Sequence, residues 1–194
     1  MDTYTQALHR FKDLLERAQG LGLKEPTAMA VATSDSQGYP SARMVLLKGV
    51  DERGFVFYTN LRSRKAQQLS ANPRASLCFF WDPLMEQVIV EGAVEPVSNE
   101  EADAYWASRP RENQLASLVS LQSQPLDSRQ TLESQLSECR ARYLGKNVPR
   151  PPHWSGFRVM PDRMEFWKTG PSRLNERVLY QKGPAGWAVG LLYP

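Results

Sequence analysis

The sequence is poor in the residues that build metal sites and disulfide frameworks. Only two cysteines, Cys78 and Cys139, and two histidines, His9 and His153, occur among 194 residues. Neither pair has the spacing of a disulfide framework or of metal ligands. The sequence also has no Gly-x-Ser-x-Gly motif, and nothing in it suggests the cysteine–histidine pair of a thiol protease. We therefore expect no metal site, and an enzyme built on this chain would take its chemistry from an organic cofactor.

Long apolar runs and a large charge of one sign are also missing. No stretch approaches the ~18 apolar residues of a membrane-spanning helix, and residues 1–4 do not have the basic and apolar regions of a signal peptide. We expect a cytoplasmic protein with no membrane partner. The formal net charge is only +3 and the basic residues are scattered, so nucleic acid is not an expected partner. A small positive surplus is suited to drawing small anionic ligands into a cleft.

What is present is typical of one globular domain spanning residues 1–194. The hydrophobic fraction is 41% and the charged fraction 23%, and the chain is long enough to bury a core. The glycine-rich phosphate motifs of parallel nucleotide-binding sheets do not occur. This absence favours an antiparallel arrangement of the strands.

The first half of the chain alternates short β-rich runs with turn residues, which predicts an antiparallel barrel or sandwich. An amphipathic helix is predicted over about residues 5–20 and a short one over about residues 64–71. Ser63 is the expected N-cap of the short helix. The predicted strands cover residues 28–33, 43–48, 55–59, 75–81 and 87–94.

The middle of the chain is predicted to be helical and its last third to return to strands. A capping box at residues 98–101 opens a helix that runs to about Ser108, and a second helix is predicted over about residues 127–143. A proline-rich connector follows at residues 148–152. Strands are then predicted over residues 156–160, 164–167, 173–180 and 187–191.

Basic residues at the start of the short helix are the first candidate site. Arg64 and Lys65 fall in its first turn, where backbone N–H groups and positive side chains together suit a phosphate. The alternative is that both are solvated side chains on an exposed helix.

The predicted strand 173–180 is the second candidate. Strand alternation would place Arg173, Asn175 and Arg177 on one face. Facing a cleft, they could hold an anion or stack on a flat ring, and Trp167 could add an aromatic wall. Facing solvent, they would have no such role.

A spacing of four residues marks a third group. Tyr105, Arg109 and Asn113 would lie along one side of a helix if the helical path continued through them. Pro110 interrupts that path, although a proline can also open the next helix.

Motifs spread over the whole chain resemble those of the pyridoxamine 5'-phosphate oxidase family. They are residues 43–48, 57–60, 63–65, 87–88, 91–92, 108–111, 122–123, 148–154, 165–167 and 173–174 with Arg177. The resemblance implies a fold that is mainly β with α, a split antiparallel β-barrel flanked by helices that binds FMN. It further implies a homodimer with two FMN sites at the subunit interface, and a C-terminal dimerisation segment over about residues 150–194.

The resemblance also implies roles for individual residues. Lys48, Tyr105 and Arg109 would bind the substrate phosphate, with help from Asn113. Arg173 and Asn175 would be the catalytic residues and would also bind the substrate, with Arg173 against the substrate ring close to the carbon that loses hydride. FMN would be held by a larger set, partly supplied by the partner subunit: Arg43, Met44, Val45, Leu46, Lys48, Tyr58, Thr59, Arg64, Lys65, Gln87, Gln122, Ser123, Trp167 and Arg177.

One geometric condition applies to this set. Arg43 and Lys48 have opposite parity along a strand. They can serve neighbouring ligands only if the strand twists or bulges, or if one of them acts from its end.

The implied reaction is oxidation of pyridoxamine 5'-phosphate or pyridoxine 5'-phosphate at the 4'-carbon. Hydride passes to N5 of the flavin, and dioxygen reoxidises the reduced FMN, giving pyridoxal 5'-phosphate and hydrogen peroxide. Because two phosphorylated ligands must lie close together, a cluster of cations suits this chemistry.

The substrate residues depart from the family pattern in two places. The family usually has Arg-Leu-His where this chain has Arg173-Leu174-Asn175, and commonly has serine where this chain has Asn113. Asn175 can form hydrogen bonds but carries no proton near neutral pH. The segment before the first helix is also short, and we expect no lid from it. Two alternatives therefore stay open: an FMN-dependent oxidase of another substrate, as in phenazine biosynthesis, and a non-catalytic protein that binds flavin or pyridoxal phosphate.

Overall fold

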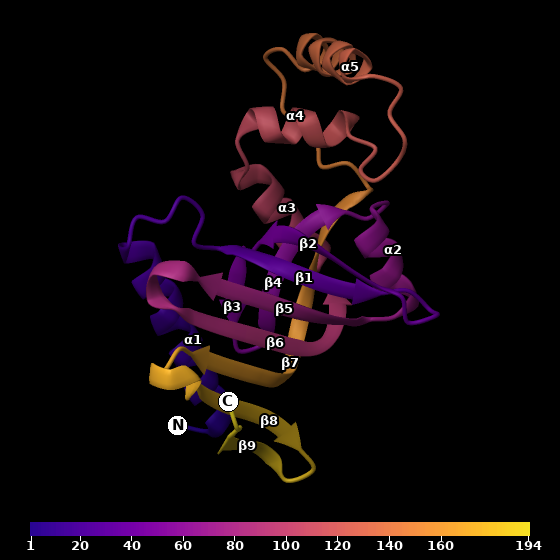
Figure 1. Ribbon diagram of the computed structural model, residues 1–194. Helices are drawn as coiled ribbons and strands as arrows, with labels where there is room; N and C mark the ends of the chain where they lie inside the picture. The colour runs from indigo at the N-terminus through magenta and orange to yellow at the C-terminus, as the bar shows by residue number, and fades with distance from the viewer.

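Alternating apolar residues build one curled antiparallel sheet in the computed structural model, which describes residues 1–194 (Figure 1). Five helices surround it: α1 (Thr3–Gly20), α2 (Arg64–Ala71), α3 (Asn99–Ser108), α4 (Arg111–Val119) and α5 (Arg129–Arg142). The nine strands are β1 (Ala28–Ser34), β2 (Pro40–Leu46), β3 (Gly49–Asp51), β4 (Gly54–Asn60), β5 (Arg74–Trp81), β6 (Glu86–Pro96), β7 (Trp154–Lys168), β8 (Glu176–Gly183) and β9 (Gly186–Leu191). The fold is the mainly β fold with flanking helices that the sequence predicts.

Strand β7 organises the sheet because it pairs with three other strands. The order is β2-β1-β5-β6-β7-β4-β3, and β8 pairs with β7 and with β9. Every pairing is antiparallel. In Figure 1 the β8–β9 hairpin lies at the bottom of the molecule and helices α3–α5 lie at the top. Helices α3–α5 and the β8–β9 hairpin therefore lie far apart in one subunit.

The main core fills the inside of the curled sheet and is closed by α1. Phe11 of α1 has no exposed surface, and its ring packs edge-on against Phe55 and Phe79, with centroids 4.8 and 4.9 Å away. Alternate residues of the strands point inward to the same core, among them Val31 and Val88. The apolar face of α1 therefore packs against the inward-facing residues of the strands in one core.

A second, smaller core attaches helices α3–α5 to the sheet. Its buried members are Trp106, Leu115, Cys139, Val148 and Trp154. Trp154 is the first residue of β7, so this cluster fixes the helices to the strand that pairs with three others. Cys139, 6% exposed, is a packing residue of this core.

Two predicted strand boundaries are wrong. Residues 156–160 and 164–167 belong to one strand, because β7 passes through the break with a register shift opposite Glu91 and Gly92. Gly92 permits this, since a Cβ there would come within 1.9 Å of the Met160 carbonyl oxygen. Strand β8 begins at Glu176, so Arg173 precedes it.

No helix is both long enough and apolar enough to cross a lipid bilayer. The capping box at Ser98 and Glu101 is present, with both reciprocal hydrogen bonds formed.

Candidate functional site

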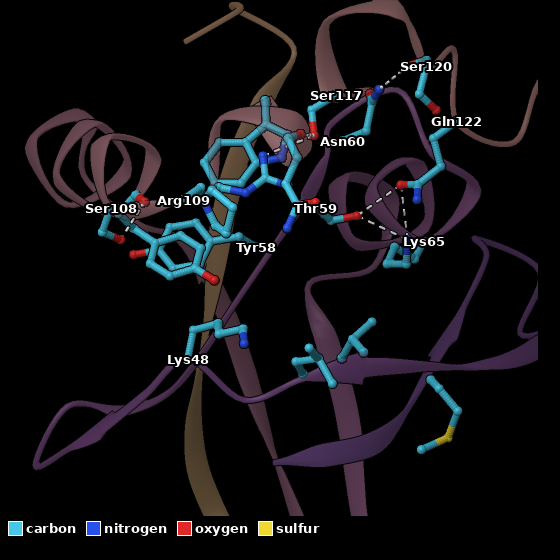
Figure 2. Close-up of a pocket in the computed structure, with 17 residues that line it drawn as sticks. Lys48, Tyr58, Thr59, Asn60, Lys65, Ser108, Arg109, Ser117, Ser120 and Gln122 are labelled. Atoms are coloured by element: carbon cyan, nitrogen blue, oxygen red, sulfur yellow. Dashed lines mark hydrogen bonds between the residues drawn. The ribbon is translucent and has the colours of Figure 1, made fainter. Parts of the chain in front are cut away.

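A cavity of about 560 Å³ lies between the sheet and the helical part of the molecule (Figure 2). Strands β2 and β4 provide one side, and the junction of α3 with α4 and the loop after α4 provide the other. It collects many of the predicted site residues from segments distant in sequence: Met44, Val45, Leu46, Lys48, Tyr58, Thr59, Lys65, Tyr105, Arg109, Asn113 and Gln122.

One end of the cavity is built around Lys65. This side chain is buried, at 7% exposure, yet no carboxylate lies within ion-pair distance of it. Its Nζ donates to Thr59 Oγ1 at 3.0 Å and, at 3.4 Å each, to Ser63 Oγ and Gln122 Oε1. Burial, and then the charge of Arg43, lower the pKa of Lys65 to about 8. A buried cation with neutral partners alone is a preformed receptor for an anion.

Helix α2 begins at the same place. Ser63 is its N-cap residue, as predicted, but its side chain accepts from Lys65 and makes no capping bond to the backbone. The free N–H groups of the first turn and the positive end of the helix dipole favour an anion there.

Arg43 lies behind this end of the cavity and does not line it. Its guanidinium donates to Thr33 Oγ1 and Ser41 Oγ at 2.6 and 2.5 Å and to Gln68 Oε1 at 3.4 Å. Burial, and then the charge of Arg64, lower the pKa of Arg43. Arg43, Arg64 and Lys65 thus form a group of three cations, none of which has a carboxylate partner.

The other end of the cavity holds a second pair of cations. Lys48 follows the end of β2 and reaches the cavity from there, which meets the condition set by its opposite parity to Arg43. Arg109 reaches it from the junction of α3 and α4. Figure 2 places Lys48 and Arg109 near Tyr58, apart from the group formed by Thr59, Lys65 and Gln122. The cavity therefore has two cationic ends.

Stacked aromatic rings line the wall at the second end. The rings of Tyr58 and Tyr105 are 4.0 Å apart between centroids and tilted by 17°. The ring of Trp154 is nearly parallel to both, 5.4 Å from Tyr58 at 5° and 6.0 Å from Tyr105 at 12°. Burial raises the pKa of both tyrosines, so both hydroxyls stay protonated near neutral pH. The wall offers apolar surface and the neutral hydroxyl of Tyr105, while that of Tyr58 donates to the Glu101 carbonyl oxygen at 3.4 Å.

A buried ion-pair cluster fixes the helix that carries Tyr105. Arg158 of β7, at 3% side-chain exposure, bonds Asp51 at 2.9 Å and Glu101 of α3 at 2.6 Å. Arg53 pairs with both carboxylates from the outside. The first turn of α3 is thereby attached to the β3–β4 hairpin.

Comparison with known proteins identifies the family. A family model described as "Pyridoxamine 5'-phosphate oxidase" matches residues 15–143, and one described as "Pyridoxine 5'-phosphate oxidase C-terminal dimerisation region" matches residues 154–194. The chain belongs to the pyridoxamine 5'-phosphate oxidase family. The resemblance seen in the sequence motifs is confirmed.

Relatives named as pyridoxine/pyridoxamine 5'-phosphate oxidases are similar in sequence over nearly the whole chain. A pyridoxine/pyridoxamine 5'-phosphate oxidase from Myxococcus xanthus (strain DK1622) is 54% identical over 187 residues, covering 96% of this chain and 91% of the relative. The enzyme of the same name from Alkalilimnicola ehrlichii is 52% identical over 196 residues, covering all of both chains. Among solved structures, PhzG from Burkholderia lata 383, in complex with tetrahydrophenazine-1-carboxylic acid, superposes with a TM-score of 0.91 at 33% identity, covering 96% of this chain and 91% of PhzG.

Several residues expected from the family lie outside the cavity of one subunit. Gln87 is opposite Trp167 in the sheet, and Trp167 is opposite Arg177, so the three share one face of β6–β8. Arg177 donates to the buried Glu165 through Nε at 2.8 Å and Nη2 at 2.7 Å. Arg64 and Ser123 do not line the cavity either.

The placement of Arg173 and Asn175 corrects the prediction that they share a strand face with Arg177. Arg173 lies in a 3₁₀ turn (Pro171–Arg173), and both Ser172 and Arg173 have left-handed backbones, with φ of 55° and 63°. Asn175 Oδ1 accepts from the backbone N–H of Gly170 at 3.1 Å, which closes this turn. The exposed Arg173 side chain therefore projects from a loop whose backbone departs from strand geometry.

The cavity also contains residues to which sequence reasoning gave no role. They are Asn60, Ser108, Pro110, Ser117, Ser120 and Trp154. Asn60, Ser108, Pro110 and Trp154 belong to motifs that carry the family resemblance, which was the available signal. Ser117 and Ser120 carry no such signal, because only the path of α4 brings them to the cavity.

Proposed function

We propose that this chain is an FMN-dependent oxidase that converts pyridoxamine 5'-phosphate or pyridoxine 5'-phosphate to pyridoxal 5'-phosphate, with dioxygen as the electron acceptor. The observation that carries the proposal is a single cavity with two separate cationic ends, neither of which has a carboxylate partner. Two phosphorylated ligands brought together need two such ends. The names of relatives that are 52–54% identical support the same activity.

The FMN phosphate fits the end formed by Lys65 and the first turn of α2. Lys65 would bind it directly, and Arg43 and Arg64 would add positive charge from behind and outside. Thr59 and Gln122 now accept from Lys65 and could turn toward the ligand. Met44, Val45 and Leu46 line the cavity along β2, beside the place where the ribityl chain and one edge of the flavin would lie.

The substrate phosphate fits the end formed by Lys48, Tyr105 and Arg109. These groups supply one ammonium, one phenol and one guanidinium, all of which donate hydrogen bonds. Asn113 also lines this end and can donate through its amide, as the serine common in the family would through its hydroxyl. The aromatic wall would exclude water from the ring of the substrate.

A homodimer would complete the site. Arg173 and Arg177 lie in and next to the β8–β9 region, at the opposite end of the molecule from α3–α5, so they would reach the cavity of the partner subunit (Figure 1). The match of residues 154–194 to a dimerisation region supports this arrangement. Because Arg177 is already paired with Glu165, it would supply N–H donors to the flavin rather than net charge.

FMN, when bound, would accept the hydride from the 4'-carbon and be reoxidised by dioxygen. The residues of this chain would hold the two phosphates, set the ring against the flavin and keep water out. Asn175 holds no titrating proton near neutral pH, so the substrate amine or alcohol would lose its proton to another group or to solvent.

The test is anaerobic mixing of the flavin-loaded protein with pyridoxamine 5'-phosphate and, separately, with pyridoxine 5'-phosphate, while flavin absorbance is followed. We expect bleaching that reverses on admission of air, with pyridoxal 5'-phosphate and hydrogen peroxide formed. A flavin that stays oxidised with both substrates would refute the proposal.

A second candidate is an FMN-dependent oxidase of a phenazine precursor. The superposition on PhzG and the departures at Asn113 and Asn175 favour it. Bleaching by a reduced phenazine carboxylic acid, without bleaching by vitamin B6 phosphates, would select this candidate. Binding of pyridoxal 5'-phosphate with no bleaching by any substrate would instead indicate a non-catalytic binding protein.

A further inference from the structure

Arg109 occupies the break between two helices. Helix α3 ends at Ser108, and the backbone of Arg109 is extended, with φ of −73° and ψ of 144°. Pro110 comes next and α4 begins at Arg111, so no helical turn carries the side chain along the helix surface. The guanidinium enters the cavity at the end where Lys48 and Tyr58 lie (Figure 2).

Neutral groups hold this guanidinium in place. Its Nη1 donates to Ser117 Oγ at 2.9 Å, and Ser117 Oγ in turn donates to the Asn113 carbonyl oxygen at 2.8 Å. Its Cζ lies 4.6 Å from the ring centroid of Trp154 and 5.2 Å from that of Trp106. Arg109 lines the cavity and makes no ion pair, so no carboxylate compensates its charge.

The indole of Trp154 is itself fixed. It is 5% exposed, lies parallel to the Tyr58 ring and meets the Trp106 ring edge-on at 4.8 Å. Its backbone carbonyl accepts from Arg150 at 2.9 Å. A guanidinium on such a surface is held by a cation–π interaction and by a hydroxyl, both of which leave its positive charge available to a ligand. A carboxylate in the same place would compete with the ligand for that charge.

The geometry points to Trp154 and Ser117 as positioning residues that hold Arg109 ready to receive the phosphate group of the substrate. This inference rests on the proposed function and adds to it two residues that the family resemblance does not assign. Ser117 stands one helical turn beyond Asn113, the position where the family commonly has serine. Ser117 therefore supplies a serine hydroxyl one turn beyond position 113, and this hydroxyl acts on the phosphate through Arg109.

The test compares the affinity of the flavin-loaded dimer for pyridoxal 5'-phosphate with its affinity for pyridoxal, which lacks the phosphate. Ser117→Ala removes the hydroxyl, and Ser117→Thr restores it. Trp154→Leu removes the aromatic face, and Trp154→Phe keeps one. Ser137→Ala, at an exposed position of α5, serves as the control.

We expect Ser117→Ala to raise the dissociation constant for pyridoxal 5'-phosphate about five- to tenfold and to leave that for pyridoxal within about twofold. Because Ser117→Thr keeps a hydroxyl, its dissociation constant for pyridoxal 5'-phosphate should stay within about twofold of the wild-type value. Trp154→Leu should weaken binding of pyridoxal 5'-phosphate about tenfold or more and Trp154→Phe about threefold, with a smaller loss for pyridoxal because Trp154 also belongs to the aromatic wall. For pyridoxine 5'-phosphate, KM should rise by the same factors while kcat stays within about twofold.

Equal losses for pyridoxal 5'-phosphate and pyridoxal in Ser117→Ala would overturn the inference, since a general structural defect affects both ligands. Unchanged binding in Ser117→Ala would overturn it as well. If Trp154→Leu does not fold, the two Ser117 variants still decide. The two failures are distinguishable. If the wild type turns over no vitamin B6 phosphate and Ser117→Ala still weakens binding of the phosphorylated ligand alone, the proposed function is refuted and this inference stands. A wild type with no preference for the phosphorylated ligand would refute the inference.

Discussion

Replacing Lys65 by methionine should weaken FMN binding and at the same time stabilise the protein without FMN. The side chain is buried and has no anionic partner within the chain, and its pKa of about 8 reflects the cost of charging it there. Methionine keeps the length of the side chain and removes the charge. In the wild type a ligand phosphate can compensate the charge of Lys65, which no carboxylate of the chain does. The variant therefore separates two effects of the charge: it favours FMN binding and it disfavours folding of the apoprotein.

The magnitude for FMN follows from one charge-assisted hydrogen bond. Such a bond contributes about 1.5–3 kcal/mol, so the dissociation constant of FMN should rise about tenfold to 150-fold in Lys65→Met. For the apoprotein the sign reverses. Lowering the pKa of Lys65 from 10.5 to about 8 corresponds to a folding penalty of at most about 3 kcal/mol, which methionine removes.

The pH dependence checks the cause. Because the folded pKa of Lys65 lies below its unfolded value, the penalty is fully present below pH about 8 and disappears as the pH rises toward 10.5. The stability gain of Lys65→Met should therefore vanish between these values. FMN affinity of the wild type should fall as the pH rises above about 8, where Lys65 loses its proton, and also below about pH 6, where the phosphate becomes a monoanion.

The assay is titration of the apoprotein with FMN, followed by quenching of flavin fluorescence, together with urea unfolding of both apoproteins at pH 7 and pH 10. Lys12→Met, which changes an exposed lysine of α1, is the control and should alter neither quantity measurably. Wild-type FMN affinity in Lys65→Met, or a less stable apoprotein at pH 7, would refute the reasoning.

Three further predictions concern residues elsewhere in the molecule. Asn175→His should raise kcat/KM for pyridoxine 5'-phosphate in steady-state assays if the site works on vitamin B6 phosphates, and a lower value would mean that the loop closed by Asn175 is what matters. Arg158→Ala should lower the free energy of unfolding in urea by about 3–5 kcal/mol, because two carboxylates lose a buried partner; a loss below ~1 kcal/mol would assign their compensation to Arg53. Gly92→Ala should destabilise the fold by more than about 2 kcal/mol, since its Cβ would meet the Met160 carbonyl oxygen at 1.9 Å, and unfolding at the wild-type urea midpoint would contradict this.

Much of the local structure followed from the sequence, because it depends on side chains close together in the chain. The apolar stripe of residues 5–20, the capping box at Ser98 and the strand patterns all gave elements at or near the predicted positions. The two wrong strand boundaries lie where the local sequence pattern does not indicate the backbone conformation. Strand β7 continues past residues 161–163 because β6 stays paired alongside, and the left-handed turn at Ser172 and Arg173 has no glycine to announce it.

The candidate site divides in the same way. The sequence alone determined which chemical groups are available: cations at the ends of elements, and motifs of the pyridoxamine 5'-phosphate oxidase family. The spacing of Tyr105, Arg109 and Asn113 also proved meaningful, since all three reach one cavity although the helix breaks at Pro110. Residue types and short spacings can be read directly from the sequence.

Only the tertiary structure decided which of these groups act together. It separated the cations into two ends of one cavity, added Ser117 and Trp154 to the second end, and put Arg173 and Arg177 in and beside the β8–β9 hairpin, far from that cavity within one subunit. Such contacts join residues tens of positions apart, and they are set by how the curled sheet, α1 and the helical cluster pack. No local propensity encodes them, because the free energy that fixes them comes from burial shared across the whole core.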